Sequence, residues 1–143
     1  TTDAEAGGNS TAEIEVVEGG PGDSDWMLEV TGEVGTDFMQ PWSGVMFMPG
    51  STPFGPANLE NMPQLHFQAA GTPGEYRVQL FCENNMQLPG EWTFEVTEEW
   101  QEYDVNLSDI GNCDTAGVLS IIFSSGTPGE YVLQLDKISV PGT

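Results

Sequence analysis

Polar and aromatic residues suited to binding a ligand stand at alternate positions of several extended segments. In residues 76–83, apolar side chains occupy every second position, which predicts one buried face, because successive side chains of a strand point to opposite faces. The positions between them predict a solvent-facing side. That side carries Arg77, Gln79, Phe81 and Glu83 in this segment, His66 and Gln68 in residues 65–69, and Gln134 in the last predicted strand. If these strands share one sheet, its outer face gathers the only His, one of the two cations, three Gln and a Phe.

Such a face has the chemistry to bind a saccharide. Amides both donate and accept hydrogen bonds, an aromatic ring stacks on the apolar side of a sugar, and the guanidinium of Arg77 offers several donors to neighbouring hydroxyls. An ordinary solvated sheet face explains the same residues, since Gln is also common on exposed strands. Both interpretations stay open at the level of sequence.

The four tryptophans divide by their surroundings. Trp42 follows Pro41 in a loop, and Trp92 follows the turn residues 89–91, so both are candidates for the rim of the ligand-binding face. Trp26 and Trp100 stand at the edges of predicted strands, and we expect them in the core.

The motifs of common enzymes are missing from the sequence. The chain has one His and two Cys, and it contains no nucleophile elbow, no zinc-protease motif and no glycine-rich phosphate loop before a helix. Zinc or catalytic-triad chemistry needs more His or Cys than this. Carboxylate pairs for glycoside hydrolysis carry no signal among 23 acidic residues, so we expect no enzyme.

The charge balance excludes two classes of partner. Twenty-three acidic residues face two basic ones, Arg77 and Lys137, and the formal net charge is -21. This surface repels phosphate backbones and anionic lipids, so nucleic acid and membrane surfaces are not expected partners. A solvated acidic surface suited to high ionic strength explains the composition.

The two cysteines allow one disulfide or none. Cys82 ends an apolar alternation, which fits a buried free thiol, whereas Cys113 stands in a polar loop, where a free thiol is a liability outside the cell. The sequence cannot settle the geometry that a bridge needs.

The pattern of the chain predicts an all-β fold. Eighteen Gly and ten Pro divide it into short segments, and none shows a sustained helical period. Residues 107–110 form at most one helical turn. About nine strands are expected, at residues 13–16, 26–34, 45–48, 65–69, 76–83, 92–96, 103–107, 118–124 and 131–140. The prediction is an antiparallel β-sandwich of the jelly-roll type, with residues 1–12 a loose acidic lead-in and 13–143 a single binding domain.

An internal repeat marks two turns. The sequence GTPGEY occurs at residues 71–76 and again at 126–131, each time between two predicted strands. Pro followed by Gly is a tight-turn signal, so we expect two equivalent hairpins.

Several segments carry a resemblance to a known family. They are residues 7–12 (GGNSTA), 28–34 (LEVTGEV), 41–47 (PWSGVMF), 76–81 (YRVQLF), 105–109 (VNLSD) and 134–138 (QLDKI), together with Trp100. Over nearly the whole chain they resemble the domain named for complex I intermediate-associated proteins, which is similar to β-glucan-binding jelly-roll modules of bacterial secreted hydrolases. The resemblance implies a galactose-binding-like jelly roll without catalytic machinery.

The same resemblance implies a structural calcium ion. Jelly-roll binding modules often hold one where the chain ends meet, and Asp136 is the nominated ligand, with Asp3 and Glu5 as partners. The family commonly has two acidic residues where this chain has Asp136 and Lys137, and a simple turn carboxylate also explains Asp136.

Together these observations predict a non-catalytic carbohydrate-binding module. Its ligand would be a polysaccharide or oligosaccharide, and it would belong to a larger extracellular or periplasmic protein. The alternatives are a protein-interaction or assembly module, or an extracellular structural subunit, that uses the same sheet face for a protein partner.

Overall fold

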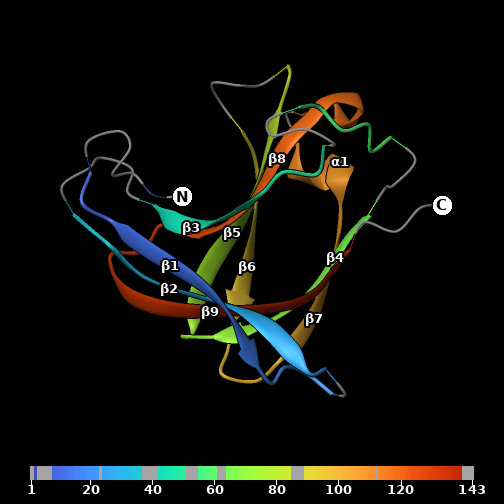
Figure 1. Ribbon diagram of the computed structural model, residues 1–143. Coiled ribbons are helices and arrows are strands. Elements are labelled where there is room, and N and C mark those ends of the chain that lie inside the picture. Colours follow the sequence, from blue (N-terminus) through green and yellow to red (C-terminus); the bar gives the residue numbers. More distant parts are fainter. Residues whose placement is uncertain are drawn as a thin grey trace.

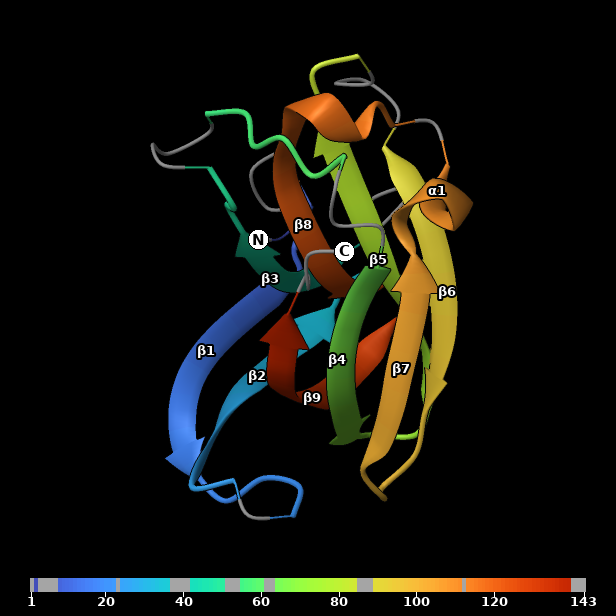
Figure 2. The same cartoon turned by 90° about the vertical axis from the view of Figure 1, so that its right-hand side faces the viewer.

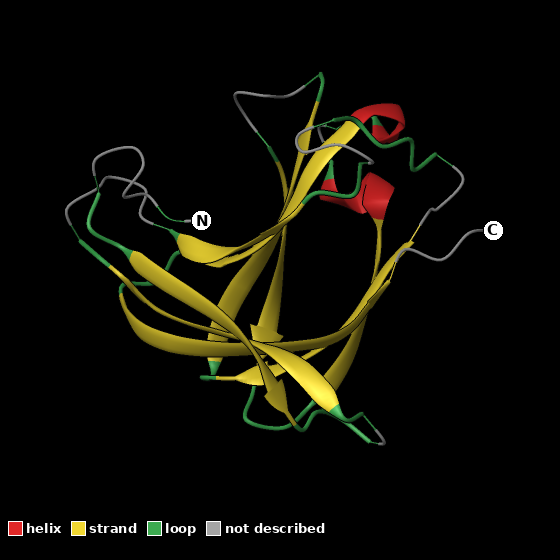
Figure 3. Cartoon of the chain, viewed as in Figure 1, coloured by secondary structure: helices red, strands yellow, loops and turns green. Residues whose placement is uncertain are grey.

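The alternating apolar segments form strands, and the turn residues between them end each one. The computed structural model describes residues 2, 8–22, 24–36, 42–50, 55–60, 64–84, 89–111 and 113–139. The described residues form the strands β1 (Thr11–Glu18), β2 (Trp26–Val34), β3 (Ser43–Phe47), β4 (Gln64–Gly71), β5 (Gly74–Cys82), β6 (Gly90–Val96), β7 (Gln101–Asn106), β8 (Val118–Ser125) and β9 (Gly129–Ser139). The short helices are α1 (Leu107–Ile110) and η2 (Thr115–Gly117), which lie together at one end of the sandwich (Figure 3). The all-β prediction is confirmed, as is the single helical turn at 107–110.

Two antiparallel sheets make up the sandwich. One has five strands in the order β1-β2-β9-β4-β7, and the other has four in the order β3-β8-β5-β6. Figure 1 shows β3 and β8 above β1, β2 and β9, and Figure 2 looks onto β4 and β7 after a quarter turn. The inner faces of the two sheets enclose the core, as in jelly rolls.

Aromatic rings occupy the middle of the core. Phe67 of β4 is almost fully buried, and its ring centroid lies 5.0 Å from that of Phe94, 5.0 Å from that of Phe123 and 5.1 Å from that of Tyr103. These residues come from β6, β8 and β7, so one side chain of the five-stranded sheet ties the two sheets together.

The predicted inner face of β5 is confirmed, and that of β8 needs one correction. Tyr76, Val78, Leu80 and Cys82 are all buried, as their alternation requires. In β8 the alternation that places Ile121 and Phe123 in the core would also place Leu119 there, but Leu119 is only half-buried and Val118 is fully buried. The reason is a shift of register: Phe81 pairs with Ser120 whereas Cys82 pairs with Val118, which leaves Leu119 outside the ladder.

The two GTPGEY turns are not hairpins. The first joins β4 to β5 and the second joins β8 to β9, and each therefore carries the chain from one sheet to the other. The first turn bonds to distant strands: the Gly71 N–H donates to the Thr97 carbonyl at 3.0 Å, and the Thr72 N–H to the Val132 carbonyl at 2.8 Å. Gly is needed at position 71, where φ is +147° and a Cβ would lie 2.1 Å from the Val132 carbonyl oxygen.

The repeated tyrosines meet inside the sandwich. The rings of Tyr76 and Tyr131 lie 6.1 Å apart in an edge-to-face arrangement. The Tyr76 hydroxyl donates to the Thr72 carbonyl at 2.8 Å, and the Tyr131 hydroxyl lies 2.6 Å from the Ser43 Oγ. Burial raises the pKa of Tyr76 to about 12 and also raises the pKa of Tyr131, so both phenols stay neutral in the core.

The cysteines form a disulfide. Cys82 at the end of β5 is bonded to Cys113, and their Cα atoms lie 5.6 Å apart. Of the two alternatives that the sequence left open, a disulfide and a free thiol at Cys82, the structure has the disulfide. The bridge joins the end of β5 to the connection between α1 and β8. In that connection the Asp114 N–H also donates a hydrogen bond to Asn84 Oδ1 at 2.8 Å.

Candidate functional site

The predicted ligand-binding residues lie on two opposite outer faces. Arg77, Gln79 and Phe81 belong to β5 of the four-stranded sheet, whereas His66 and Gln68 of β4 and Gln134 of β9 belong to the five-stranded sheet. The assumption that these strands share one sheet is wrong. The physical reason is that each GTPGEY turn carries the chain from one sheet to the other. The strands before and after the turn therefore lie in different sheets, and their outward side chains point in opposite directions.

The outer face of the five-stranded sheet is strongly acidic. Its outward-facing carboxylates are Glu13, Glu15, Glu29, Glu33, Glu102, Asp104, Glu130 and Asp136. The predicted ligand-binding residues on this face already have partners. His66 forms an ion-pair contact with Asp104, and the Gln134 amide donates to Glu29 Oε2 at 3.2 Å. Gln68 stands opposite Glu102 in the ladder, so this half of the predicted set lies among acceptors.

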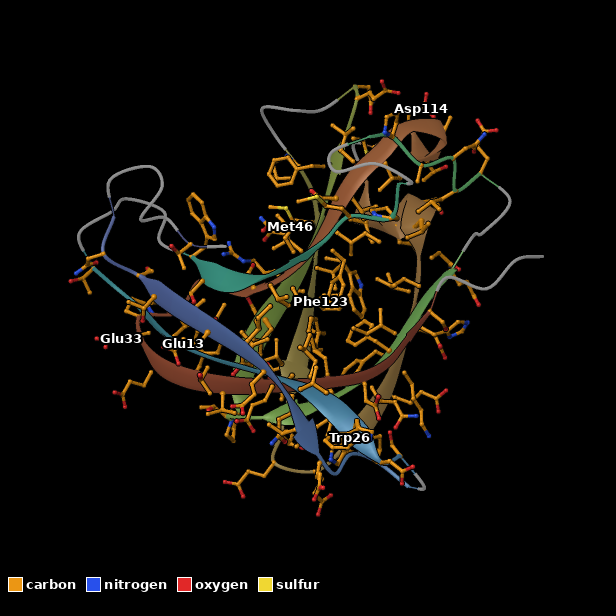
Figure 4. The ribbon with its side chains drawn as sticks, viewed as in Figure 1. Glu13, Trp26, Glu33, Met46, Asp114 and Phe123 are labelled. Atoms are coloured by element: carbon orange, nitrogen blue, oxygen red, sulfur yellow. A yellow bond between two sulfur atoms is a disulfide. The ribbon has the colours of Figure 1, made fainter. Side chains whose placement is uncertain are left out.

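The outer face of the four-stranded sheet, called the recessed face here because of a hollow beside Arg77, carries buried side chains along β8. Ser120, Ile122 and Ser124 point outward, yet they are only 3%, 4% and 0% exposed. Figure 4 shows Met46 of β3 on this outer side and Phe123 on the core side. The outward-facing residues of β8 are therefore covered by their neighbours, whereas Arg77, Gln79 and Phe81 of β5 are half-buried.

A polar network crosses three strands of this recess. The Ser124 hydroxyl donates to Gln79 Oε1 at 3.3 Å, and the Gln79 amide donates to Glu91 Oε2 at 3.4 Å. Arg77 Nη1 lies 4.0 Å from the same Glu91 oxygen, which makes Glu91 its ion-pair partner. These contacts are long, so none of them binds its donor or acceptor tightly.

Arg77 lies beside a hollow in this face. Its buried Nε has no hydrogen-bond partner among the described residues, and its guanidinium borders a hollow of about 190 Å³. The hollow is lined by Glu75, Arg77, Glu91, Gly126 and Thr127. A guanidinium donor and carboxylate acceptors therefore meet at one concave place on a chain with only two basic residues.

Trp42 extends this face at its β3 edge. Ser43 and Val45 point into the core, so Gly44 and Met46 lie on the outer side, and half-buried Trp42 directly precedes the strand. Gly44 is required here because a Cβ would lie 2.1 Å from the Phe123 carbonyl oxygen.

The prediction of Trp92 as a rim residue is wrong. It pairs with Val78 in the ladder and therefore points inward, where its ring stacks on Phe94 at 5.8 Å. Strand β6 begins at Gly90, two residues before Trp92, so the residue lies within the strand and follows its alternation. The prediction of a buried Trp26 is also wrong, since this side chain is 55% exposed.

Sequence reasoning missed Glu91, which lies at the centre of the network. The signal was present: with Trp92 and Phe94 on the inner face, Glu91, Thr93 and Glu95 must face outward. Their partners across β5 could not be known without the register. Nothing in the local sequence shows that Glu91 stands opposite Gln79.

Asp136 anchors a loop in the described structure. Its Oδ2 accepts a hydrogen bond from the Ser24 hydroxyl, and its Oδ1 accepts one from the Lys137 N–H at 2.8 Å. Within the described ranges, no group of three His, Cys, Asp or Glu is arranged to hold a metal ion. Asp3 and Glu5 lie outside the described residues. The surroundings of Asp136 fit a hydrogen-bonded anchor, and a calcium ion at this residue stays a prediction.

Removing the Asp136 carboxylate separates the two roles. As an anchor, Asp136→Ala should lower the free energy of unfolding by about 0.5–1.5 kcal/mol, because it removes the hydrogen bonds from the Ser24 hydroxyl and the Lys137 N–H, which are exposed or part-buried. Denaturant unfolding should show the same loss in calcium and in chelator. A loss that appears only in calcium would show instead that Asp136 binds the ion.

Comparisons with known proteins show the fold. No protein-family model matches this chain, and no curated protein matches it. The family 11 carbohydrate-binding module of a cellulosomal cellulase of Clostridium thermocellum aligns with a TM-score of 0.73 at 14% identity, over 94% of this chain and 83% of that one. A second structure of the family 11 module, in complex with a β-1,3-1,4-mixed-linked tetrasaccharide, aligns with a TM-score of 0.72 at 15% identity, over 94% and 84%.

A third similar structure belongs to another family of modules. The family 30 carbohydrate-binding module of a second cellulosomal cellulase of Clostridium thermocellum aligns with a TM-score of 0.68 at 15% identity, over 92% of this chain and 88% of that one. At these identities the likeness shows a jelly-roll β-sandwich of the kind found in carbohydrate-binding modules. It does not support the expected label of a complex I intermediate-associated domain. Among the described residues, no helix is long and apolar enough to cross a membrane.

Proposed function

We propose that this chain is a non-catalytic saccharide-binding module whose binding face is the recessed outer face of the four-stranded sheet. The observation that carries the proposal is the network of Arg77, Gln79, Glu91 and Ser124 across β5, β6 and β8. Its contacts are long enough to be exchanged for contacts with a ligand.

The chemistry of the network matches a polyol. Vicinal hydroxyls need donors and acceptors side by side, and the face provides a guanidinium, an amide and a carboxylate within neighbouring ladder positions. Phe81 follows Gln79 by two residues in β5, so it lies on the same outer face, and it supplies a ring on which the apolar face of a sugar can stack. Trp42 supplies a second ring at the β3 edge.

Two further observations support the proposal. The similar solved structures are carbohydrate-binding modules, and one of them is in complex with a mixed-linked tetrasaccharide. The Cys82–Cys113 disulfide is typical of an oxidising compartment, which supports the inference of an extracellular or periplasmic protein. Membership of a larger protein is part of the same proposal.

Truncation of the binding face is the test. Arg77→Ala and Phe81→Ala should each weaken binding of a β-1,3-1,4-mixed-linked glucose tetrasaccharide, or of another active member of a saccharide panel, by about tenfold, or 1.4 kcal/mol. Each removes a half-buried outward-facing side chain, so the melting temperature should barely change. Isothermal titration calorimetry and thermal unfolding measure the two effects.

The opposite face provides matched controls. Gln68→Ala and Gln134→Ala remove outward-facing amides from the five-stranded sheet, and they should leave saccharide affinity unchanged. If these variants lose binding while Arg77→Ala keeps it, the binding face is the other one. If the wild-type chain binds no saccharide on the panel but captures a protein, the module serves assembly and the proposal fails.

A further inference from the structure

Exposed apolar side chains line the free end of the β1–β2 hairpin. Trp26 is 55% exposed, and Ile14 and Val16 are 60% and 64% exposed. The register pairs Ile14 with Val30 and Val16 with Leu28, so these residues and Trp26 share the inner face of the five-stranded sheet. They form one apolar strip on a face that is otherwise covered.

The strip is exposed because the other sheet does not reach it. β3 meets the hairpin at its opposite end, where the Ser43 hydroxyl donates to the Thr11 carbonyl at 2.6 Å. Trp26 lies at the far end of the same hairpin, opposite Glu18. Figure 4 shows Trp26 near the lower end of β2, well apart from Met46 beside β3, so this strip is separate from the recessed face.

Several contacts join the described residues beside Trp26 to one another and to β9. The Gly19 N–H donates to the Asp25 carbonyl at 3.0 Å, and the Ser24 hydroxyl lies within hydrogen-bond distance of both the Trp26 carbonyl and Asp136 Oδ2. At Gly20 φ is +128°, and a Cβ there would lie 2.9 Å from Asp136 Oδ2, so glycine lets this residue approach β9. Trp26 therefore stands next to residues that are hydrogen-bonded to β9 and to each other.

The surroundings of Trp26 are rich in acceptors. A hollow of about 460 Å³ beside the indole is lined by Glu18, Gly19, Ser24, Asp25 and Trp26. Two carboxylates and a hydroxyl thus border an exposed aromatic ring, and the lining contains no basic side chain. Carboxylates accept hydrogen bonds from sugar hydroxyls, while the indole stacks on the apolar face of a sugar ring.

We propose that Trp26, with Glu18 and Asp25, forms a second and separate binding site for a neutral saccharide chain. The class of ligand rests on the proposed function, but the site does not depend on the recessed face. The charges exclude two other occupants: an anionic ligand is repelled by the two carboxylates, and a second copy of the chain carries the same net charge of -21. A neutral polyol meets neither obstacle.

Nuclear magnetic resonance can observe this site directly. The chain has four tryptophans, whose indole N–H signals are few enough to assign, and Trp26→Phe identifies the one of interest. We expect titration with β-1,3-1,4-mixed-linked, β-1,4-linked and β-1,3-linked glucose tetrasaccharides to move the Trp26 signal saturably, both in the wild-type chain and in Arg77→Ala. Because Trp26→Ala has no Trp26 signal, isothermal titration calorimetry in the Arg77→Ala background measures the effect of this variant, which should lower saccharide affinity about tenfold, as loss of a stacked ring predicts.

Charge-neutral variants of β1 supply a matched pair. Glu18→Gln alters the lining of the hollow, whereas Glu13→Gln alters a carboxylate of the same strand on the acidic outer face. Only Glu18→Gln should reduce the saccharide-dependent shift of the Trp26 signal. Thermal unfolding should show that Trp26→Ala, Glu18→Gln and Glu13→Gln are all folded.

The outcomes separate this inference from the proposed function. If the Trp42 signal moves with saccharide while the Trp26 signal does not, the second site is refuted and the recessed face stands. If no signal moves with any saccharide, both proposals fail. If Trp26→Ala instead abolishes a concentration-dependent self-association, the strip is a contact between copies and the inference is overturned.

Discussion

Loss of the Cys82–Cys113 disulfide is expected to lower the free energy of unfolding by about 3–4 kcal/mol. The bridge closes a loop between residues 31 positions apart, and a loop of this size restricts the unfolded chain by about that amount. Urea unfolding of the double variant Cys82→Ala/Cys113→Ala, compared with the wild-type chain, measures the loss. In thermal unfolding the same loss should lower the melting temperature by about 10 °C.

The double variant also supplies its own control. A reductant should destabilise the wild-type chain to a similar extent and leave the double variant unchanged, because the variant has no bridge to break. Thiol titration of the unfolded wild-type chain without reductant should find no free thiol. Equal stability of the two proteins in the absence of reductant would contradict the prediction.

Truncation of Phe67 should have an effect of similar size. Its ring contacts Phe94, Tyr103 and Phe123, and Phe67→Ala leaves a cavity between the sheets. We expect a loss of about 3–5 kcal/mol in the free energy of unfolding, because large-to-small changes in a packed core cost both burial and cavity formation. Phe67→Leu keeps most of the volume and should cost less than about 1.5 kcal/mol.

Phe81→Ala is the matched control for this truncation. It removes the same side chain from β5, but from the outward side of the four-stranded sheet, and it should cost far less stability. The comparison also tests which side of β5 faces the core. Equal losses at the two positions would mean that the outer face is covered, which would remove the basis for a binding face there.

Alternation along the chain predicted which side of each strand is buried, and it did so reliably in β4 and β5. Leu65, Phe67, Tyr76 and Val78 are all buried, as expected. The reason is physical: side chains alternate between the two sides of a strand, and exposing apolar surface costs free energy, so the apolar side must face the core. The same period carries no information about which sheet a strand joins.

Sheet membership depends on the turns, and the turn residues were ambiguous. Pro and Gly in GTPGEY allow a reversal of the chain, but the same residues serve a hairpin within one sheet and a crossing between two. The crossing is fixed by distant bonds, such as the one from the Thr72 N–H to the Val132 carbonyl. The predicted site was therefore divided, with Arg77 on one face and His66 on the other.

The positions of the tryptophans depend on where each sheet ends. Trp92 has a turn before it in sequence, yet the strand begins early enough to include it in the core layer. Trp26 follows the inner-face alternation of β2, yet the smaller sheet stops short of it. Whether a side chain at a strand end is buried depends on how far the opposite sheet extends. The local sequence pattern does not show that extent.

The place of β9 in its sheet has a consequence for the order of folding. β9 is the last described strand in the sequence, but it lies in the middle of the five-stranded sheet, between β2 and β4. The β1–β2 hairpin emerges first during synthesis and has no partner in its own sheet until β9 arrives, so the slow step must join chain segments from opposite ends of the sequence. During that interval the unpaired edge of β2 is a template for wrong pairing, and the glutamates of the hairpin, Glu13, Glu15, Glu29 and Glu33, repel a second chain that approaches it.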